Sequence, residues 1–182
     1  MISIARLLLF FVITMGYNAF FRNTVKMNRS LTWVFTFSVI TLVLYLGSLL
    51  GFMLQTVYAI SVLGCLLSLY YLWAVWKKKY RFGRLDYIAL GMMAYLLLFG
   101  ITLWHSPLLH YDNFTHWATI VKFFHINNAL PTQQDTIISY YTYPVGSSLF
   151  IYFFTTIVGF SEGSMLVGQF FLIASSLDRK SV

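Results

Sequence analysis

The chain contains 182 residues, of which 59% are hydrophobic, 20% are aromatic and only 9% are charged, and its formal net charge is +7. A soluble domain carries about 25% charged residues, because its surface must face water. This composition excludes an ordinary soluble domain, and we predict an all-α, polytopic membrane protein. The single cysteine, Cys65, also excludes an internal disulfide and a cysteine-based metal cluster.

Apolar segments along the chain predict about six transmembrane helices in a single membrane domain. A span needs about 20 mostly apolar residues. The first segment resembles a signal peptide, but no small-residue cleavage site follows it. Residues 31–76 contain no charge and have the length of two spans, with a turn expected near Gly47 and Gly51. The predicted spans cover about residues 2–21, 31–50, 55–76, 86–104, 144–160 and 164–177 of the domain 1–182.

The last apolar run, after residue 164, is shorter than a full crossing requires. Either this segment is re-entrant, or the sequence is the N-terminal part of a longer protein. We favour the second interpretation.

Positive charges gather in two short links between apolar runs. Residues 22–30 hold three basic residues, and residues 77–85 hold five. Under the positive-inside rule these links face the cytoplasm, which places loop 105–143 on the extracytoplasmic side of a multi-pass cell-membrane protein. The links also suit contacts with anionic membrane lipids. Since no basic face is interleaved with aromatic residues on an exposed element, nucleic acid is excluded as a partner.

The loop at residues 105–143 concentrates the polar residues of the chain. All four histidines and all three prolines lie within residues 105–144. A helix over residues 111–125 would have one polar and one apolar stripe, which predicts an amphipathic juxtamembrane helix in the interface. The sequence "NNALP" at 127–131 predicts its end. The polar stripe would contain Asp112, Thr115, His116, Thr119 and Lys122, and the apolar stripe Phe114, Trp117, Ala118, Val121 and Phe124.

The polar stripe suits acid–base and phosphate chemistry. Asp112 in a partly desolvated site is a candidate general base, and Lys122 with His110 or His116 is a candidate site for a phosphate. Simpler interpretations stay open: Asp112 could cap the helix start, and His116 could lie at the interface without a ligand. Asp112 and His116 offer only two metal ligands. We therefore predict no metal site and no cofactor, and keep a divalent metal as an alternative.

The sequences "YDNFTHWATIVKFFHINNALP" (111–131) and "YYTYPVGSSLFIYFF" (140–154) resemble the first long extracytoplasmic loop of GT-C-type membrane glycosyltransferases. These polytopic enzymes use a polyprenyl-phosphate-linked sugar. The resemblance implies that Asp112 is the catalytic base and that His116, Trp117 and Lys122 belong to the helix that shapes the donor site. The Leu130–Pro131 pair matches the helix exit, Tyr143, Pro144 and Gly146 match the return motif, and His110 and Tyr143 complete the candidate substrate-binding residues.

The implied function is transfer of a sugar from the lipid-linked donor to a cell-surface acceptor on the extracytoplasmic side. Asn113 stands where many members carry a second acid, which disfavours a metal-dependent mechanism. Four predicted spans precede the loop, where many members have one. Two other classes stay open: a transporter or permease component, for which Glu162 is the candidate charge, and a non-catalytic membrane assembly protein. The oligomeric state is also left open.

Overall fold

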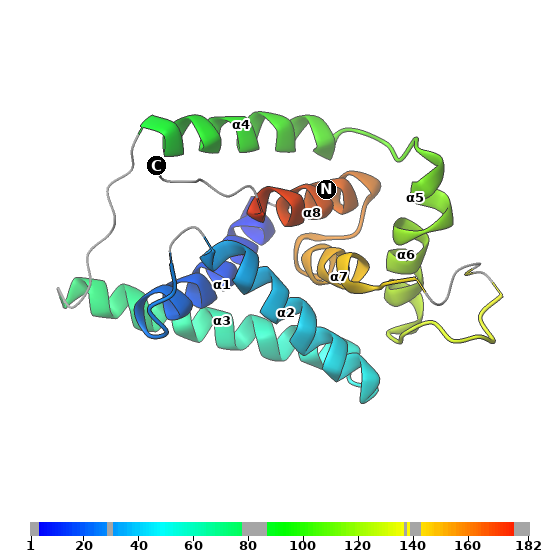
Figure 1. Cartoon of the computed structure of the whole chain (residues 1–182), viewed down its shortest axis with the longest axis horizontal. Helices are drawn as coiled ribbons and strands as arrows, with labels where there is room; N and C mark the ends of the chain where they lie inside the picture. The colour runs from blue at the N-terminus through cyan, green and yellow to red at the C-terminus, as the bar shows by residue number, and fades with distance from the viewer. Residues whose placement is uncertain (1–3, 29–30, 78–86, 137, 139–142, 177–182) are drawn as a thin grey trace.

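The computed structural model describes residues 4–28, 31–77, 87–136, 138 and 143–176 of the chain (Figure 1). These residues form eight helices and no strand, which confirms the predicted all-α class. The helices are α1 (Ile4–Asn23), α2 (Thr32–Leu49), α3 (Met53–Trp76), α4 (Tyr87–Trp104), α5 (Tyr111–Thr115), α6 (Trp117–Asn127), α7 (Gly146–Val158) and α8 (Glu162–Ser175).

Three of these helices have the length and the apolar character needed to cross a membrane. α1, α2 and α3 contain 20, 18 and 24 residues, and about 20 residues span the hydrocarbon core. Many of their large apolar side chains are exposed, so the chain is suited to a membrane. In α4 the apolar stretch that the structure describes is Ala94–Trp104, and α7 and α8 contain 13 and 14 residues. Spans at α4, α7 and α8 therefore stay predictions.

α1 and α3 approach each other closely because small residues line their crossing point. A Cβ atom on Gly16 would lie 2.1 Å from the carbonyl oxygen of Gly64, so only glycine fits there. Beside this contact, the Tyr17 hydroxyl donates to the carbonyl of Ile60 at 2.8 Å. The hydroxyl of Ser68 donates to a backbone carbonyl of α1. A close backbone approach and two hydrogen bonds from side chains to backbone carbonyls thus hold the two helices together.

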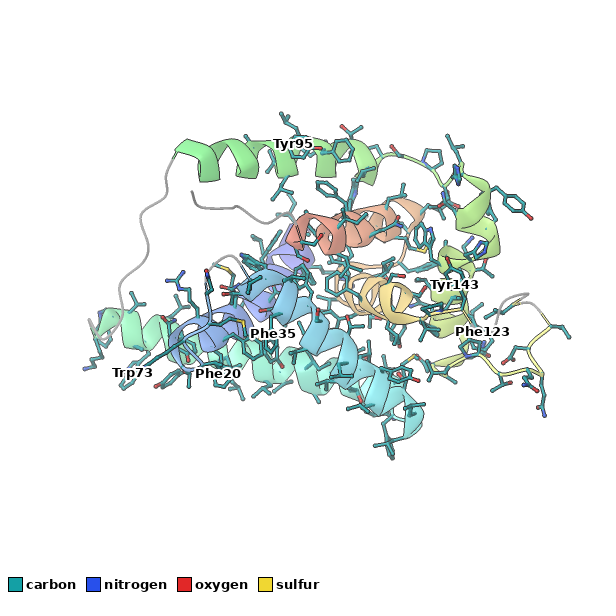
Figure 2. The ribbon with its side chains drawn as sticks, in the orientation of Figure 1. Phe20, Phe35, Trp73, Tyr95, Phe123 and Tyr143 are labelled. Carbon is teal, nitrogen blue, oxygen red and sulfur yellow. The ribbon has the colours of Figure 1, made fainter. Side chains whose placement is uncertain are left out.

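α1 and α3 run in the same direction, and α2 returns the chain between them (Figure 1). The Thr24 hydroxyl is hydrogen-bonded to the Tyr71 hydroxyl, so the link after α1 lies beside the last turns of α3. Phe20 and Trp73 mark this end of the molecule (Figure 2). Both basic links therefore start at the same end of the α1–α3 pair. The α2–α3 turn lies at Gly51, with a φ of 79°, as predicted.

α7 forms the centre of the core and contacts α1, α2, α6 and α8. Every side chain from Ser148 to Thr155 is buried. Phe10 of α1 packs edge-on against Phe154, with ring centroids 4.8 Å apart. α8 packs against α7 and also against α4, where Phe99 and Phe170 lie 5.0 Å apart. The α7–α8 pair therefore joins α4 to the α1–α3 bundle.

α5 and α6 lie at the end of the molecule opposite the carboxyl ends of α1 and α3 (Figure 1). α6 runs beside α7 in the same direction. The Ser148 hydroxyl at the start of α7 donates to the Trp117 carbonyl at the start of α6. Near the other ends of both helices, Thr155 pairs with His125. α5 and α6 thus lie at the end of the structure opposite the points where the two basic links start.

The prediction of one continuous helix over residues 111–125 is wrong. His116, with a φ of −125° and a ψ of −107°, separates α5 from α6. The helical phase that grouped Asp112 with residues of α6 is therefore lost. The Thr119 hydroxyl donates to the Phe114 carbonyl across the break. This bond gives the carbonyl a side-chain partner in place of the backbone partner of a continuous helix.

Candidate functional site

The candidate site is built from α5, the start of α6 and the return segment that leads into α7. His110 immediately precedes α5 and is exposed. Asp112 lies in the first turn of α5, at the end of the molecule away from the basic links. The side chain of Asp112 lies outside the described part of the chain, so its role as a base stays a prediction.

His116 and Tyr143 are brought together although 27 positions separate them in the sequence. Their ring centroids lie 4.9 Å apart in an edge-on arrangement, with His116 half-buried and Tyr143 about half exposed. The labelled Tyr143 lies near α6 and α7 (Figure 2). The ring of His116, at the break between α5 and α6, is therefore in contact with the return segment, and these two predicted ligand-binding side chains lie next to each other.

A groove of about 680 Å³ lies between α2, α8 and the loop. The helix-exit pair Leu130–Pro131 and the return motif at Tyr143, Pro144 and Gly146 line the same groove, although these two motifs lie well apart in the sequence. Ser38, Thr41 and Tyr45 of α2 add hydroxyl groups to a wall that is otherwise mainly apolar. The remaining lining residues are Leu42, Val145, Leu149 and Leu172.

Trp117 and Lys122 lie on α6 in different surroundings. Trp117 is half-buried and packs against the small cluster around Leu108 and Val121. Its carbonyl accepts the bond from α7 described above, so Trp117 anchors α6 against the core. Lys122 is half-buried, and no hydrogen bond or ring contact in the described part of the chain joins it to Tyr143. The structure thus shows Trp117 packed at the start of α6, and the substrate contacts of Trp117 and Lys122 both stay predictions.

His125 is a polar residue of this region that was not among the predicted site residues. Its Nε2 lies 2.8 Å from the Thr155 hydroxyl oxygen. That hydroxyl donates to the Ile151 carbonyl at 2.8 Å, so it accepts from His125, which leaves Nδ1 as the acceptor nitrogen of the neutral ring. Burial lowers the pKa of His125 to about 4, so the ring is neutral near pH 7. One sequence signal was available: His125 follows Val121 by four positions, on the buried face of α6.

The end of α6 is formed by the asparagines, as predicted. Asn128 caps the helix in the left-handed conformation, with a φ of 49°, and its backbone N–H bonds to the Phe124 carbonyl. The side-chain oxygen of Asn128 accepts a bond from the Tyr152 hydroxyl at 2.9 Å. This bond ties the exit of α6 to the middle of α7 and fixes the direction in which the chain continues toward Pro131.

The tetrad "SEGS" joins the start of α8 to the end of α4. Ser161 and Ser164 cap α8 reciprocally through their side chains and backbone N–H groups. Gly163 permits a close approach, since a Cβ atom there would lie 2.0 Å from the Trp104 carbonyl oxygen. Glu162 accepts a bond from the backbone N–H of Leu108 at 3.0 Å. The carboxylate of Glu162 therefore holds the segment that leads into α5.

Among the residues that the structure describes, no group of three or more histidine, cysteine or acidic side chains could hold a metal ion. Comparison of the chain with family models, curated proteins and solved structures finds no match.

Proposed function

We propose that the chain is part of a membrane glycosyltransferase of the GT-C type, which transfers a sugar from a polyprenyl-phosphate-linked donor on the extracytoplasmic side. The observation that carries this function is the convergence of the motif segments. Leu130–Pro131 and the Tyr143–Gly146 return segment line one groove, and His116 packs on Tyr143 at its edge. A largely apolar groove with a few hydroxyl groups suits a lipid-linked sugar, whose chain is apolar and whose sugar is polar.

The chemistry assigned to this site is a single displacement at the anomeric carbon. The carboxylate of Asp112 takes the proton of the acceptor hydroxyl as its oxygen bonds to the anomeric carbon. The bond from that carbon to the phosphate oxygen breaks, and the electron pair leaves with the polyprenyl phosphate. Lys122, with His110 or His116, stabilises the negative charge of the leaving group. Trp117 holds α6 in place for this arrangement.

The proposed topology has six spans, with links 22–30 and 77–85 in the cytoplasm and loop 105–143 outside. Support comes from the position of the basic links, which start at one end of the α1–α3 pair while α5 and α6 lie at the other (Figure 1). A lipid-linked donor is presented at the membrane surface. We expect α6 to be amphipathic and to carry an active face at that surface, which suits this donor.

A transport function rested on Glu162 as an intramembrane charge. Its carboxylate accepts the Leu108 N–H, and its side chain is exposed at a helix start. This bond accounts for the acid without an ion pathway, so the enzyme function is preferred.

The test is the substitution Asp112→Asn in the full-length protein in its own cells, with the surface glycan as the measurement. Loss of a general base lowers such reactions by about 10²-fold or more. Asp135→Asn is the matched control, because Asp135 lies in the same loop and its carboxylate accepts hydrogen bonds only from Thr132 among the described residues. Normal glycan in cells that hold wild-type amounts of Asp112→Asn protein would exclude this function.

A further inference from the structure

We propose that anionic phospholipid headgroups bind specifically at the carboxyl end of the α1–α3 pair. This basic end consists of the cations Arg22, Lys26 and Lys77 and the exposed aromatic side chains Tyr70, Trp73 and Trp76. This basic end lies at the end of the molecule opposite the proposed glycosyltransferase site, so lipid binding there is independent of the proposed function.

The three cations come from two helices that the fold holds together. Arg22 lies in the last turn of α1 and Lys77 caps α3. The Thr24–Tyr71 hydrogen bond joins these two ends. Tyr71 precedes Lys77 by six residues, which is about 9 Å along the helix and close to the Debye length at physiological ionic strength. The positive fields of the two ends therefore combine over one patch of membrane.

The aromatic side chains fix the depth of this end in the membrane. Tyr70, Trp73 and Trp76 are 46%, 51% and 75% exposed on the last turns of α3. Exposed tryptophan and tyrosine prefer the headgroup level, where an apolar ring and a polar edge are both solvated. The ammonium group of Lys77 lies 5.0 Å from the centre of the Trp76 ring. Its charge is thus held at the level where lipid phosphates lie.

The backbone conformation of Lys26 also supports a cation-dependent role for this end of the molecule. It is exposed and has a φ of 58°, in the left-handed region that favours glycine. The turn around it is ordered by backbone bonds from Thr24 to Phe20 and from Met27 to Phe21. A lysine in this conformation costs about 1 kcal/mol or more relative to a relaxed residue. The position keeps a cation where glycine would fit the backbone better.

The excess of positive charge among the described residues at this end favours an anionic partner. The acids whose side chains the structure describes are Asp135 and Glu162, and both lie toward the opposite end of the molecule. No described carboxylate therefore neutralises the three cations. A membrane surface that contains phosphatidylglycerol would do so, while zwitterionic phosphatidylcholine would not.

The experiment titrates the purified full chain in neutral detergent with phosphatidylglycerol or phosphatidylcholine. The apparent affinity of each lipid is taken from the rise in unfolding temperature. Phosphatidylglycerol is expected to bind more tightly, and the difference should shrink as salt is raised. Each of Arg22→Gln, Lys26→Gly and Lys77→Gln should weaken its binding about fivefold, the equivalent of about 1 kcal/mol per cation. Binding of phosphatidylcholine should stay unchanged.

Two control variants make the result decisive. Lys26→Arg keeps the charge and should keep the affinity, whereas Lys26→Gly suits the backbone and removes the side chain with its charge. Arg6→Gln changes an exposed cation at the opposite end of α1 and should leave the affinity unchanged. Equal binding of both lipids by the wild type would overturn the proposal. A preference for phosphatidylglycerol that persists when Arg22→Gln, Lys26→Gly and Lys77→Gln are combined would also overturn it. So would loss of this preference in Lys26→Arg, or a loss in Arg6→Gln as large as in the three single variants.

Discussion

The α1–α3 pair and the α6–α7 pair show two different ways of joining parallel helices. α1 meets α3 where side chains are missing, so that Gly16 and Gly64 allow backbone contact and hydroxyl groups bond to carbonyls. α6 meets α7 through large buried side chains and through polar pairs such as His125 with Thr155. In the first joint the hydroxyl groups of Tyr17 and Ser68 are both bonded to backbone carbonyls. The second keeps ionisable and hydroxyl groups close to the loop surface.

This difference separates the scaffold of the molecule from its candidate site. In lipid, hydrophobicity does not drive helices together, so small residues and close packing must do so. A site for a polar reaction instead needs side chains that are held in place but reach solvent. The α6–α7 pair meets that need by burying one face of α6 and fixing its exit at Asn128.

The strongest test of this contrast is to add one methyl group at the α1–α3 crossing. Gly16→Ala would place its Cβ 2.1 Å from a backbone oxygen that cannot move without shifting α3. We expect a loss of about 3 kcal/mol in stability, measured as thermal unfolding in detergent. Gly100→Ala in α4 is the matched control, since its Cβ would meet nothing within 4 Å. An unchanged unfolding temperature for Gly16→Ala would contradict the close crossing.

The bond from Glu162 to Leu108 gives a second, smaller effect at the loop end. Glu162→Ala leaves the backbone N–H of the buried residue Leu108 without its acceptor, which should cost about 1 to 3 kcal/mol. Glu162→Gln keeps an acceptor oxygen and should lose less. Thermal unfolding compares the two variants. If both are as stable as the wild type and solute flux into liposomes requires Glu162, a transport function replaces the structural one.

His125 predicts a pH dependence of stability. Burial lowers the pKa of its ring from 6.5 to about 4, so between these values the unfolded chain binds a proton that the folded chain does not. The contribution of neutral His125 to the free energy of unfolding is therefore fully present above about pH 6.5 and is lost as the pH falls toward 4. The loss should be on the order of 1 kcal/mol, because part of the ring reaches solvent.

The measurement for His125 is the unfolding temperature from pH 7.5 to 4. His125→Gln, which can still donate to Thr155, should flatten this part of the curve. An identical pH slope in the wild type and in His125→Gln would show that other groups cause it.

The positions of the long helices could be read from the sequence. Charged links and apolar runs bound α1, α2 and α3 to within two or three residues, because lipid leaves few alternatives to a continuous apolar helix. Gly51 indicated the α2–α3 turn, and the asparagines at positions 127 and 128 indicated the end of α6. Each of these signals is local.

The parts that could not be read depend on contacts between distant residues. No proline or glycine marks the break at His116, where Tyr143 of the return segment packs against the ring. The bond between Leu108 and Glu162 joins residues 54 positions apart, and that between His125 and Thr155 joins residues 30 apart. The polar residues of the loop predicted the candidate site from the sequence. The structure was needed to show that Leu130–Pro131 and the return motif line one groove.

The most direct test of the central claim is sugar transfer by the purified full-length protein in liposomes, with a polyprenyl-phosphate-linked sugar as the donor. The wild type should release polyprenyl phosphate and lengthen the acceptor, and Asp112→Asn should do so at least about 10²-fold more slowly while Asp135→Asn keeps its rate. Equal rates for the wild type and Asp112→Asn, in protein with the same unfolding temperature, would contradict the assignment of this loop as a glycosyltransferase site.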